Sequence, residues 1–117
     1  MLEKFGIGID VVDVDRFYSK RFSENEDFYR KIFNDDEIQY CLKFKNPYPI
    51  FAGKFALKEA VIKALKEKID LLEIETFHEN DKPHVKLTNY PNHSSICSIS
   101  HENNVAVAVF LIENHTL

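Results

Sequence analysis

The sequence predicts one α+β domain in which an antiparallel sheet packs against a long central helix and several shorter helices. Helical spacing of apolar residues prevails from about residue 13 to residue 68, and strand-like alternation replaces it from about residue 72 onward. The chain has 117 residues, of which 44% are hydrophobic and 29% charged, as is usual for one globular domain. We therefore expect residues 1–117 to form a single domain.

The first elements are a strand and two short helices. Apolar residues alternate with glycine over Phe5–Asp10, which suits a buried strand whose backbone is closely approached by another element. Asp13 is expected to cap a short helix that carries Phe17 and Tyr18 on one side. A second helix is expected over Asp27–Phe33.

The middle of the chain predicts two further helices separated by prolines. Asn34 and Glu37 stand in capping-box spacing, so a helix is expected from there to about Phe44. The prolines of Asn46–Pro49 should break it, because proline interrupts helical hydrogen bonding. The most regular helical pattern runs from Phe51 to about Lys68, with lysines expected opposite its apolar side.

The last third of the chain predicts two β-hairpins. Four segments alternate apolar and polar residues as strands do: Leu72–Phe77, His84–Thr88, Ile96–Ser100 and Val105–Glu113. Asn80–Pro83 reads as the first turn, and Asn103-Asn104 as the second, since asparagine tolerates positive φ.

Charge, hydropathy and cysteine content exclude several classes of protein. A net charge of −4 argues against a generally basic nucleic-acid-binding protein. The longest unbroken apolar run, Val105–Ile112, is too short to span a bilayer, so no membrane association is expected. Without an evident secretory leader, Cys41 and Cys97 are expected to be reduced thiols in the cytoplasm.

Three residues are candidates for metal and anion chemistry. Asp10 closes the first strand, where its carboxylate either caps the next helix or reaches a ligand or cation. Glu59 and Lys63 lie four residues apart and share a helix face. They form either an exposed ion pair or a divided site in which Glu59 binds Mg²⁺ and Lys63 holds an anionic oxygen.

A basic segment and a serine-rich strand end favour a phosphorylated ligand. Residues 41–68 carry seven lysines against two glutamates, a local charge of +5, which leaves −9 for the remainder. Such a run is also typical of a solvated lysine face. Ser98 and Ser100 share one face of a strand ending at His101 and can donate to a phosphate, or are ordinary polar positions on an exposed strand.

Gly6–Asp10, Phe51–Ala64 and Ser98–His101, taken in this order, resemble the holo-acyl-carrier-protein synthase family, the short and trimeric 4′-phosphopantetheinyl transferases. The resemblance covers nearly the whole chain and implies the phosphopantetheinyl transferase fold. It implies an enzyme of fatty acid biosynthesis and lipid metabolism. This enzyme would move the 4′-phosphopantetheine arm of coenzyme A to a serine of apo acyl carrier protein and release 3′,5′-ADP. It also implies a homotrimer with active sites between subunits.

The resemblance further implies a role for each matched residue. Asp10 and Glu59 would bind Mg²⁺, and one of them, directly or through bound water, would accept the serine proton. Lys63 would contact the pyrophosphate of coenzyme A. The remaining ligand-binding positions would be Lys54 and Lys58, which add positive potential near the phosphates, and Ser98, Ser100 and His101, which surround the nucleotide end, reaching a neighbouring subunit.

The sequence departs from the family pattern after the central helix. The family continues into a Gly-Thr-Gly-like turn, where backbone approaches the ligand, but Leu65–Ile69 contains no glycine. This departure leads to an alternative, a non-catalytic homologue of the same fold that binds coenzyme A or a nucleotide. A third possibility is a structural domain in which Glu59 and Lys63 are only a surface pair. Basic side chains for docking an acidic carrier protein are expected at Arg16, Lys20, Arg21, Arg30 and Lys31.

Overall fold

The computed structural model describes residues 2–114 as an α+β fold, which confirms the predicted class. In chain order its elements are η1 (Leu2–Lys4), β1 (Phe5–Asp13), α1 (Asp15–Tyr18), η2 (Phe22–Glu24), α2 (Glu26–Arg30), α3 (Asp35–Leu42), α4 (Tyr48–Leu65), η3 (Leu71–Glu73), β2 (Ile74–Glu79), β3 (Lys82–Leu87), β4 (His93–Glu102) and β5 (Val105–Asn114). Within this part of the chain no helix is long and apolar enough to cross a membrane.

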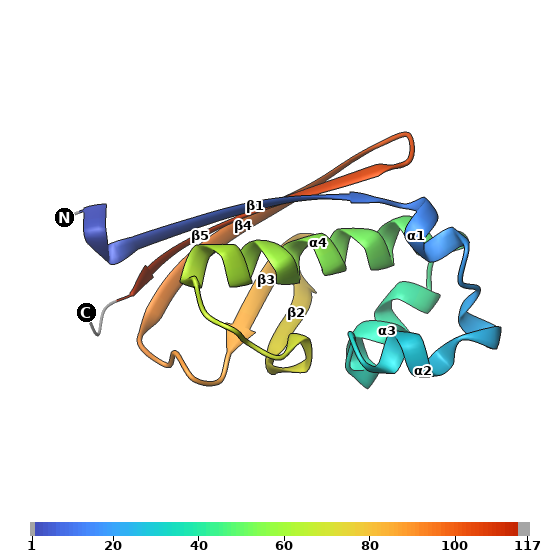
Figure 1. Ribbon diagram of the computed structural model, residues 1–117, viewed down its shortest axis with the longest axis horizontal. Coiled ribbons are helices and arrows are strands. Elements are labelled where there is room, and N and C mark those ends of the chain that lie inside the picture. Colours follow the sequence, from blue (N-terminus) through green and yellow to red (C-terminus); the bar gives the residue numbers. More distant parts are fainter. Residues whose placement is uncertain (1, 115–117) are drawn as a thin grey trace.

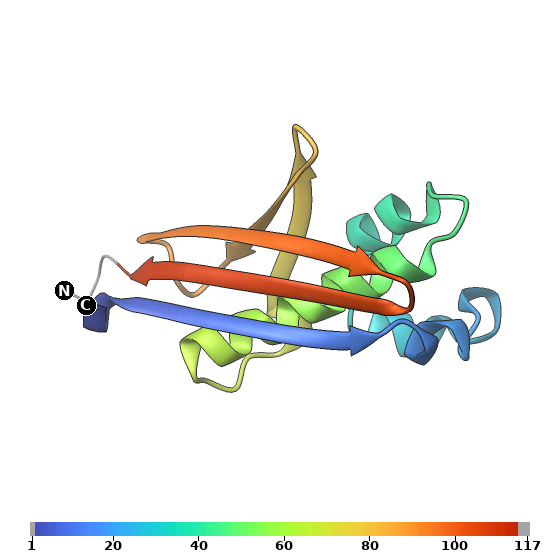
Figure 2. The same cartoon turned by 90° about the horizontal axis from the view of Figure 1, so that it is seen from above.

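A long three-stranded sheet and the helix α4 form the body of the molecule. The strands are antiparallel in the order β1-β5-β4, and α4 lies along one face of this sheet (Figure 1). The short helices α1 to α3 gather near the N-terminal end of α4. The separate hairpin β2–β3 projects from the body beside β4 (Figure 2).

The central helix begins and ends at positions that differ from those expected. It starts at Tyr48, with Pro47 as its N-cap, and Pro49 lies within its first turn. Proline is tolerated there because the first N–H groups of a helix have no intrahelical acceptor. The helix ends at Leu65, before the expected Lys68, because Lys66 adopts a left-handed conformation with φ 57°.

The shorter helices confirm one capping prediction and correct another. Asn34 and Glu37 form the expected capping box at the start of α3. Val14, and not Asp13, occupies the N-cap position of α1. Asp13 ends β1, and its carboxylate accepts a hydrogen bond from the N–H of Asp15, the first residue of that helix, at 2.9 Å. The second helix ends at Arg30, three residues earlier than expected, because the chain turns before the new capping box begins.

Both predicted hairpins are present, with tight asparagine-containing turns. Asn80 and Asp81 join β2 to β3 with φ of 54° and 63°, so the turn is shorter than the expected four residues. Asn103, with φ 53°, opens the turn between β4 and β5. The first hairpin starts at Ile74 because Asp70 caps a short 3-10 turn ahead of it.

The two faces of the three-stranded sheet differ in burial. Its inner face packs on α4, whose other side is covered by an aromatic cluster around Phe17, Tyr29, Phe33 and Phe51. Its outer face is apolar and open. The apolar residues of this outer sheet face are Ile7, Ile9 and Val11 on β1, Ile96 on β4, and Val107, Val109 and Leu111 on β5. In a single copy of the chain, Ile7 and Ile96 are 68% and 69% exposed.

Candidate active site

Asp10 lies on the inner face of the sheet because strand side chains alternate. The even-numbered residues of β1 face α4, whereas Ile9 and Val11 point to the outer sheet face. Glycine allows the strand to approach the helix closely: a Cβ on Gly8 would collide with the carbonyl oxygen of Ala60. The Asp10 side chain is therefore held against α4, with 16% of its surface exposed.

Lys63 reaches from α4 across to this strand. Its Nζ donates to Asp10 Oδ1 at 2.9 Å and to the Ile9 carbonyl oxygen at 3.0 Å. In the described residues its ion pair is with Asp10, so the expected Glu59–Lys63 surface pair is not what the structure contains. Glu59 lies one turn before Lys63 on the same helix and is partly exposed. The structure thus brings Asp10 and Lys63 into contact, with Glu59 one helical turn before Lys63 on the facing helix.

The donor set of this site suits a hard divalent cation. Asp10 and Glu59 offer carboxylate oxygens, and Mg²⁺ is commonly held by one or two carboxylates together with substrate phosphates and water. No group of three or more His, Cys, Asp or Glu side chains that could hold a metal occurs within residues 2–114. Side chains of this part of the chain therefore do not form a complete coordination shell. A cation bound here would take its remaining ligands from a bound phosphate and from water.

Lys58 has a structural role that the sequence did not predict. Its side chain is fully buried, and its Nζ donates to Glu37 Oε1 at 2.8 Å, to the Ile32 carbonyl at 2.7 Å and to the Leu71 carbonyl at 2.9 Å. These bonds use all three N–H donors, and Glu37 balances the charge. Because α4 is covered on both sides, this lysine lies inside and joins elements of the fold, and its expected contribution near a ligand's phosphates stays a prediction.

Glu37 is the centre of the same buried network. Beyond Lys58, its oxygens accept the Asn34 N–H at 2.8 Å, the Thr76 N–H at 2.7 Å and the Thr76 hydroxyl at 2.5 Å. The network joins α3, α4 and β2, so it fixes how α4 is rotated beneath the sheet. Burial lowers the pKa of Lys58, and the Glu37 carboxylate opposes that shift.

Lys54 lies one turn before Lys58 and is also buried. Its Nζ donates to the Thr76 hydroxyl at 3.1 Å and lies 4.8 Å from the centre of the Tyr40 ring. The lysines of α4 are thus not all on a solvated face. Lys54 nevertheless lines a small cleft of about 150 Å³ that His101 also lines.

Strand β4 places Ser98 and Ser100 on one face of the sheet and His101 on the other. Ser98 and Ser100 point to the outer sheet face, opposite Val109 and Val107 on β5. His101 points to the inner side, where its Nε2 lies 2.9 Å from the Pro49 carbonyl oxygen. Within one chain these residues do not surround a single ligand, and both serines lie on the opposite side of the sheet from Asp10.

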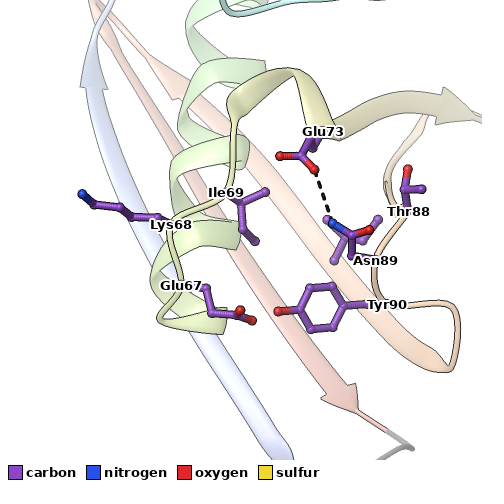
Figure 3. A pocket seen from close by; sticks show the side chains of 8 residues that line it. Glu67, Lys68, Ile69, Glu73, Thr88, Asn89 and Tyr90 are labelled. Carbon is purple, nitrogen blue, oxygen red and sulfur yellow. Dashed lines mark hydrogen bonds between the residues drawn. The ribbon is translucent and has the colours of Figure 1, made fainter.

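A pocket near the C-terminal end of α4 contains residues that the sequence did not single out. It encloses about 290 Å³ between the loop after α4 and the loop after β3 (Figure 3). Tyr90 points toward Glu67 across it, and Asn89 Nδ2 donates to Glu73 Oε2 at 3.3 Å. A neighbouring groove of about 490 Å³ shares Glu67 and Tyr90 and extends along Lys66 to the start of β1. The only sequence signal here was the missing glycine turn after Lys63.

Known proteins match this chain along most of its length. Residues 6–110 match the 4′-phosphopantetheinyl transferase superfamily. The holo-[acyl-carrier-protein] synthase of Thermodesulfovibrio yellowstonii is 42% identical over 110 residues, which cover 92% of this chain and 96% of the relative. The protein of the same name from Chlamydia trachomatis is 36% identical over 118 residues, covering 93% and 99%.

Solved structures agree with these sequence matches. The holo-(acyl-carrier-protein) synthase of Bacillus anthracis, in complex with CoA (3′,5′-ADP), superposes with a TM-score of 0.81 and 28% identity over 93% of this chain and 96% of that protein. The Helicobacter pylori enzyme, in complex with coenzyme A, gives a TM-score of 0.79 and 34% identity over 92% and 99%.

Proposed function

The chain belongs to the holo-[acyl-carrier-protein] synthase family of 4′-phosphopantetheinyl transferases, and we propose on this premise that it modifies an acyl carrier protein. The co-substrate is coenzyme A, which two solved relatives of this fold bind. A serine oxygen of the carrier attacks the β-phosphate and forms a new P–O bond. The phosphoanhydride bond breaks, and 3′,5′-ADP leaves with the electron pair.

The contact between Asp10 and Lys63, with Glu59 one turn away, carries this proposal. Asp10 and Glu59 would hold Mg²⁺, which when bound neutralises charge on the diphosphate. Lys63 is half exposed, so its ammonium is accessible to a phosphate oxygen of the ligand. One of the two carboxylates accepts the proton from the attacking serine hydroxyl.

The turn without glycine does not favour the non-catalytic alternative. Lys66 adopts the left-handed conformation that a glycine would adopt at low cost, so α4 ends there and the turn is formed. The alternative predicts binding of coenzyme A in calorimetry without transfer to any carrier. The two functions are therefore separated by one assay.

We propose that the outer sheet face is covered by further copies of this chain in a homotrimer. The middle of this face is dominated by exposed apolar side chains, and a second copy offers the same surface. Ser98 and Ser100 lie on it, so assembly would bring them near a neighbouring subunit. In analytical ultracentrifugation, Ile7→Lys should lower the oligomeric mass, whereas Phe77→Lys on the β2 hairpin should not.

Mass spectrometry tests the activity. Apo acyl carrier protein, coenzyme A and Mg²⁺ should yield a carrier that has gained one phosphopantetheine when this protein is added. Glu59→Ala should remove the gain while the variant stays folded by circular dichroism, and Glu79→Ala on the hairpin is the matched control. Transfer at the wild-type rate by Glu59→Ala would refute the metal assignment.

A further inference from the structure

Both hydrogen bonds of Lys63 within residues 2–114 are made to β1, the strand that carries the proposed metal ligand Asp10. Its ammonium lies 2.9 Å from Asp10 Oδ1 and 3.0 Å from the carbonyl oxygen of Ile9. A lysine at this position has other options, because half of its side chain faces solvent and Glu59 lies four residues earlier on the same helix. The contact with Asp10 is thus a specific one, reinforced by a backbone acceptor.

The proposed function requires these two groups to act on different partners. Asp10 is to bind a divalent cation, and Lys63 is to bind a phosphate of the ligand. An ammonium and a divalent cation beside one carboxylate repel each other, and the repulsion is stronger where water is partly excluded. Asp10 is only 16% exposed, so screening by solvent is reduced at this carboxylate.

We propose that Lys63 is a built-in competitor for the metal site. In the free protein its ammonium neutralises Asp10 and keeps the affinity for a divalent cation low. A diphosphate draws Lys63 away from Asp10, and the carboxylate then becomes available to the cation. Metal and diphosphate therefore bind as a coupled pair, and each favours the other. This inference rests on the proposed assignment of Asp10 as a metal ligand.

Binding of Mn²⁺ to the full chain, without coenzyme A, tests the competition. Electron paramagnetic resonance of free Mn²⁺ should show that Lys63→Met binds the ion at least about threefold more tightly than the wild type, because the competing charge is gone. Lys63→Arg retains the charge and should bind weakly, like the wild type. Lys66→Met removes a lysine just beyond the end of the same helix and should stay within about twofold of the wild type. Thermal unfolding confirms that each variant is folded.

The outcomes separate this inference from the proposed function. Unchanged or weaker Mn²⁺ binding by Lys63→Met would overturn it, since Lys63 would then only orient Asp10. An equal gain in Lys66→Met would also overturn it, because the effect would be one of general charge. If Lys63→Met binds more tightly but the wild type transfers no phosphopantetheine, the competition stands and the proposed function fails. If the wild type transfers and Lys63→Met gains nothing, only the competition fails.

Discussion

Two lysines of α4 form ion pairs of nearly equal length with carboxylates of other elements, but in opposite surroundings. Lys58 and Glu37 are 2.8 Å apart, and their side chains are 0% and 1% exposed. Lys63 and Asp10 are 2.9 Å apart, and their side chains are 54% and 16% exposed. The first pair is closed, because Lys58 has no N–H to spare, whereas Lys63 makes two hydrogen bonds within residues 2–114 and is open to solvent.

The difference shows that the position on α4, and not the residue type, decides what a lysine does. A buried pair with every hydrogen bond made holds elements together and has nothing left for a ligand. A partly exposed pair adds little stability but places both charges where a ligand can reach them. Each prediction below breaks one side of this contrast.

Breaking the closed pair should have the largest effect. Lys58→Met leaves the Glu37 carboxylate buried and without its counter-ion, so the free energy of unfolding should fall by about 3–5 kcal/mol in urea denaturation. Lys58→Met combined with Glu37→Gln removes both charges and should recover at least about 1 kcal/mol of that loss. A single variant that loses less than about 1 kcal/mol would show that the pair is not structural.

Breaking the open pair should separate activity from stability. Asp10→Asn should change the free energy of unfolding by less than about 1 kcal/mol, because the pair is partly solvated. Phosphopantetheine transfer should nevertheless fall at least about a hundredfold, the cost of losing one group that stabilises transition-state charge. Steady-state kinetics at saturating Mg²⁺ and urea denaturation measure the two effects, and a matched loss in both would contradict the contrast.

Lys66 is a third lysine for comparison. It lies at the C-cap of α4 and belongs to neither of the two ion pairs. It occupies the left-handed region at φ 57°, which costs a non-glycine residue about 1 kcal/mol. Lys66→Gly should therefore stabilise the protein by an amount of this order, whereas Lys68→Gly should not. Differential scanning calorimetry of the two variants measures the difference, and a lower melting temperature for Lys66→Gly would contradict the prediction.

A smaller effect should come from His78, which lines the same small cleft as the buried Lys54. It stacks on Tyr40 at 4.6 Å, and its buried Nδ1 has no hydrogen-bond partner in residues 2–114. Burial, and then the charge of Lys54, lower the pKa of His78 below its ordinary 6.5. The unfolded chain therefore takes up a proton as the pH falls through 6.5 while the folded chain does not, and stability declines with acidification. The melting temperature of His78→Phe should decline less between pH 7.5 and pH 5.5, and an identical decline would exclude this histidine as a cause.

The sequence predicted local features better than it predicted which faces of the helices and strands are buried. The capping box at Asn34 and Glu37 is a short-range pattern and was found correctly. The burial of Lys58 was missed because helical spacing was read as one apolar side and one solvated side, whereas α4 is covered by the sheet and also by α3 and β2. Such a lysine is recognised only when its buried acceptor from another element is known.

The site residues show the same limit. The contact of Lys63 with Asp10 joins positions 53 residues apart, and sequence spacing alone indicated a Glu59 partner instead. The separation of Ser98 from His101 was available from strand alternation, which places odd and even residues on opposite sides. The pocket beside Tyr90 depends on how two loops meet, and no local pattern indicates that.

The missing side chains of Gly6 and Gly8 have a consequence for mutational scanning. A methyl group at either position would strike the helix backbone at Ala64 or Ala60 and push β1 away. Every substitution there should abolish activity in a survey of variants, as substitutions of a reacting group would. A parallel measurement of soluble yield distinguishes these spacer positions from Asp10, the proposed metal ligand two residues after Gly8.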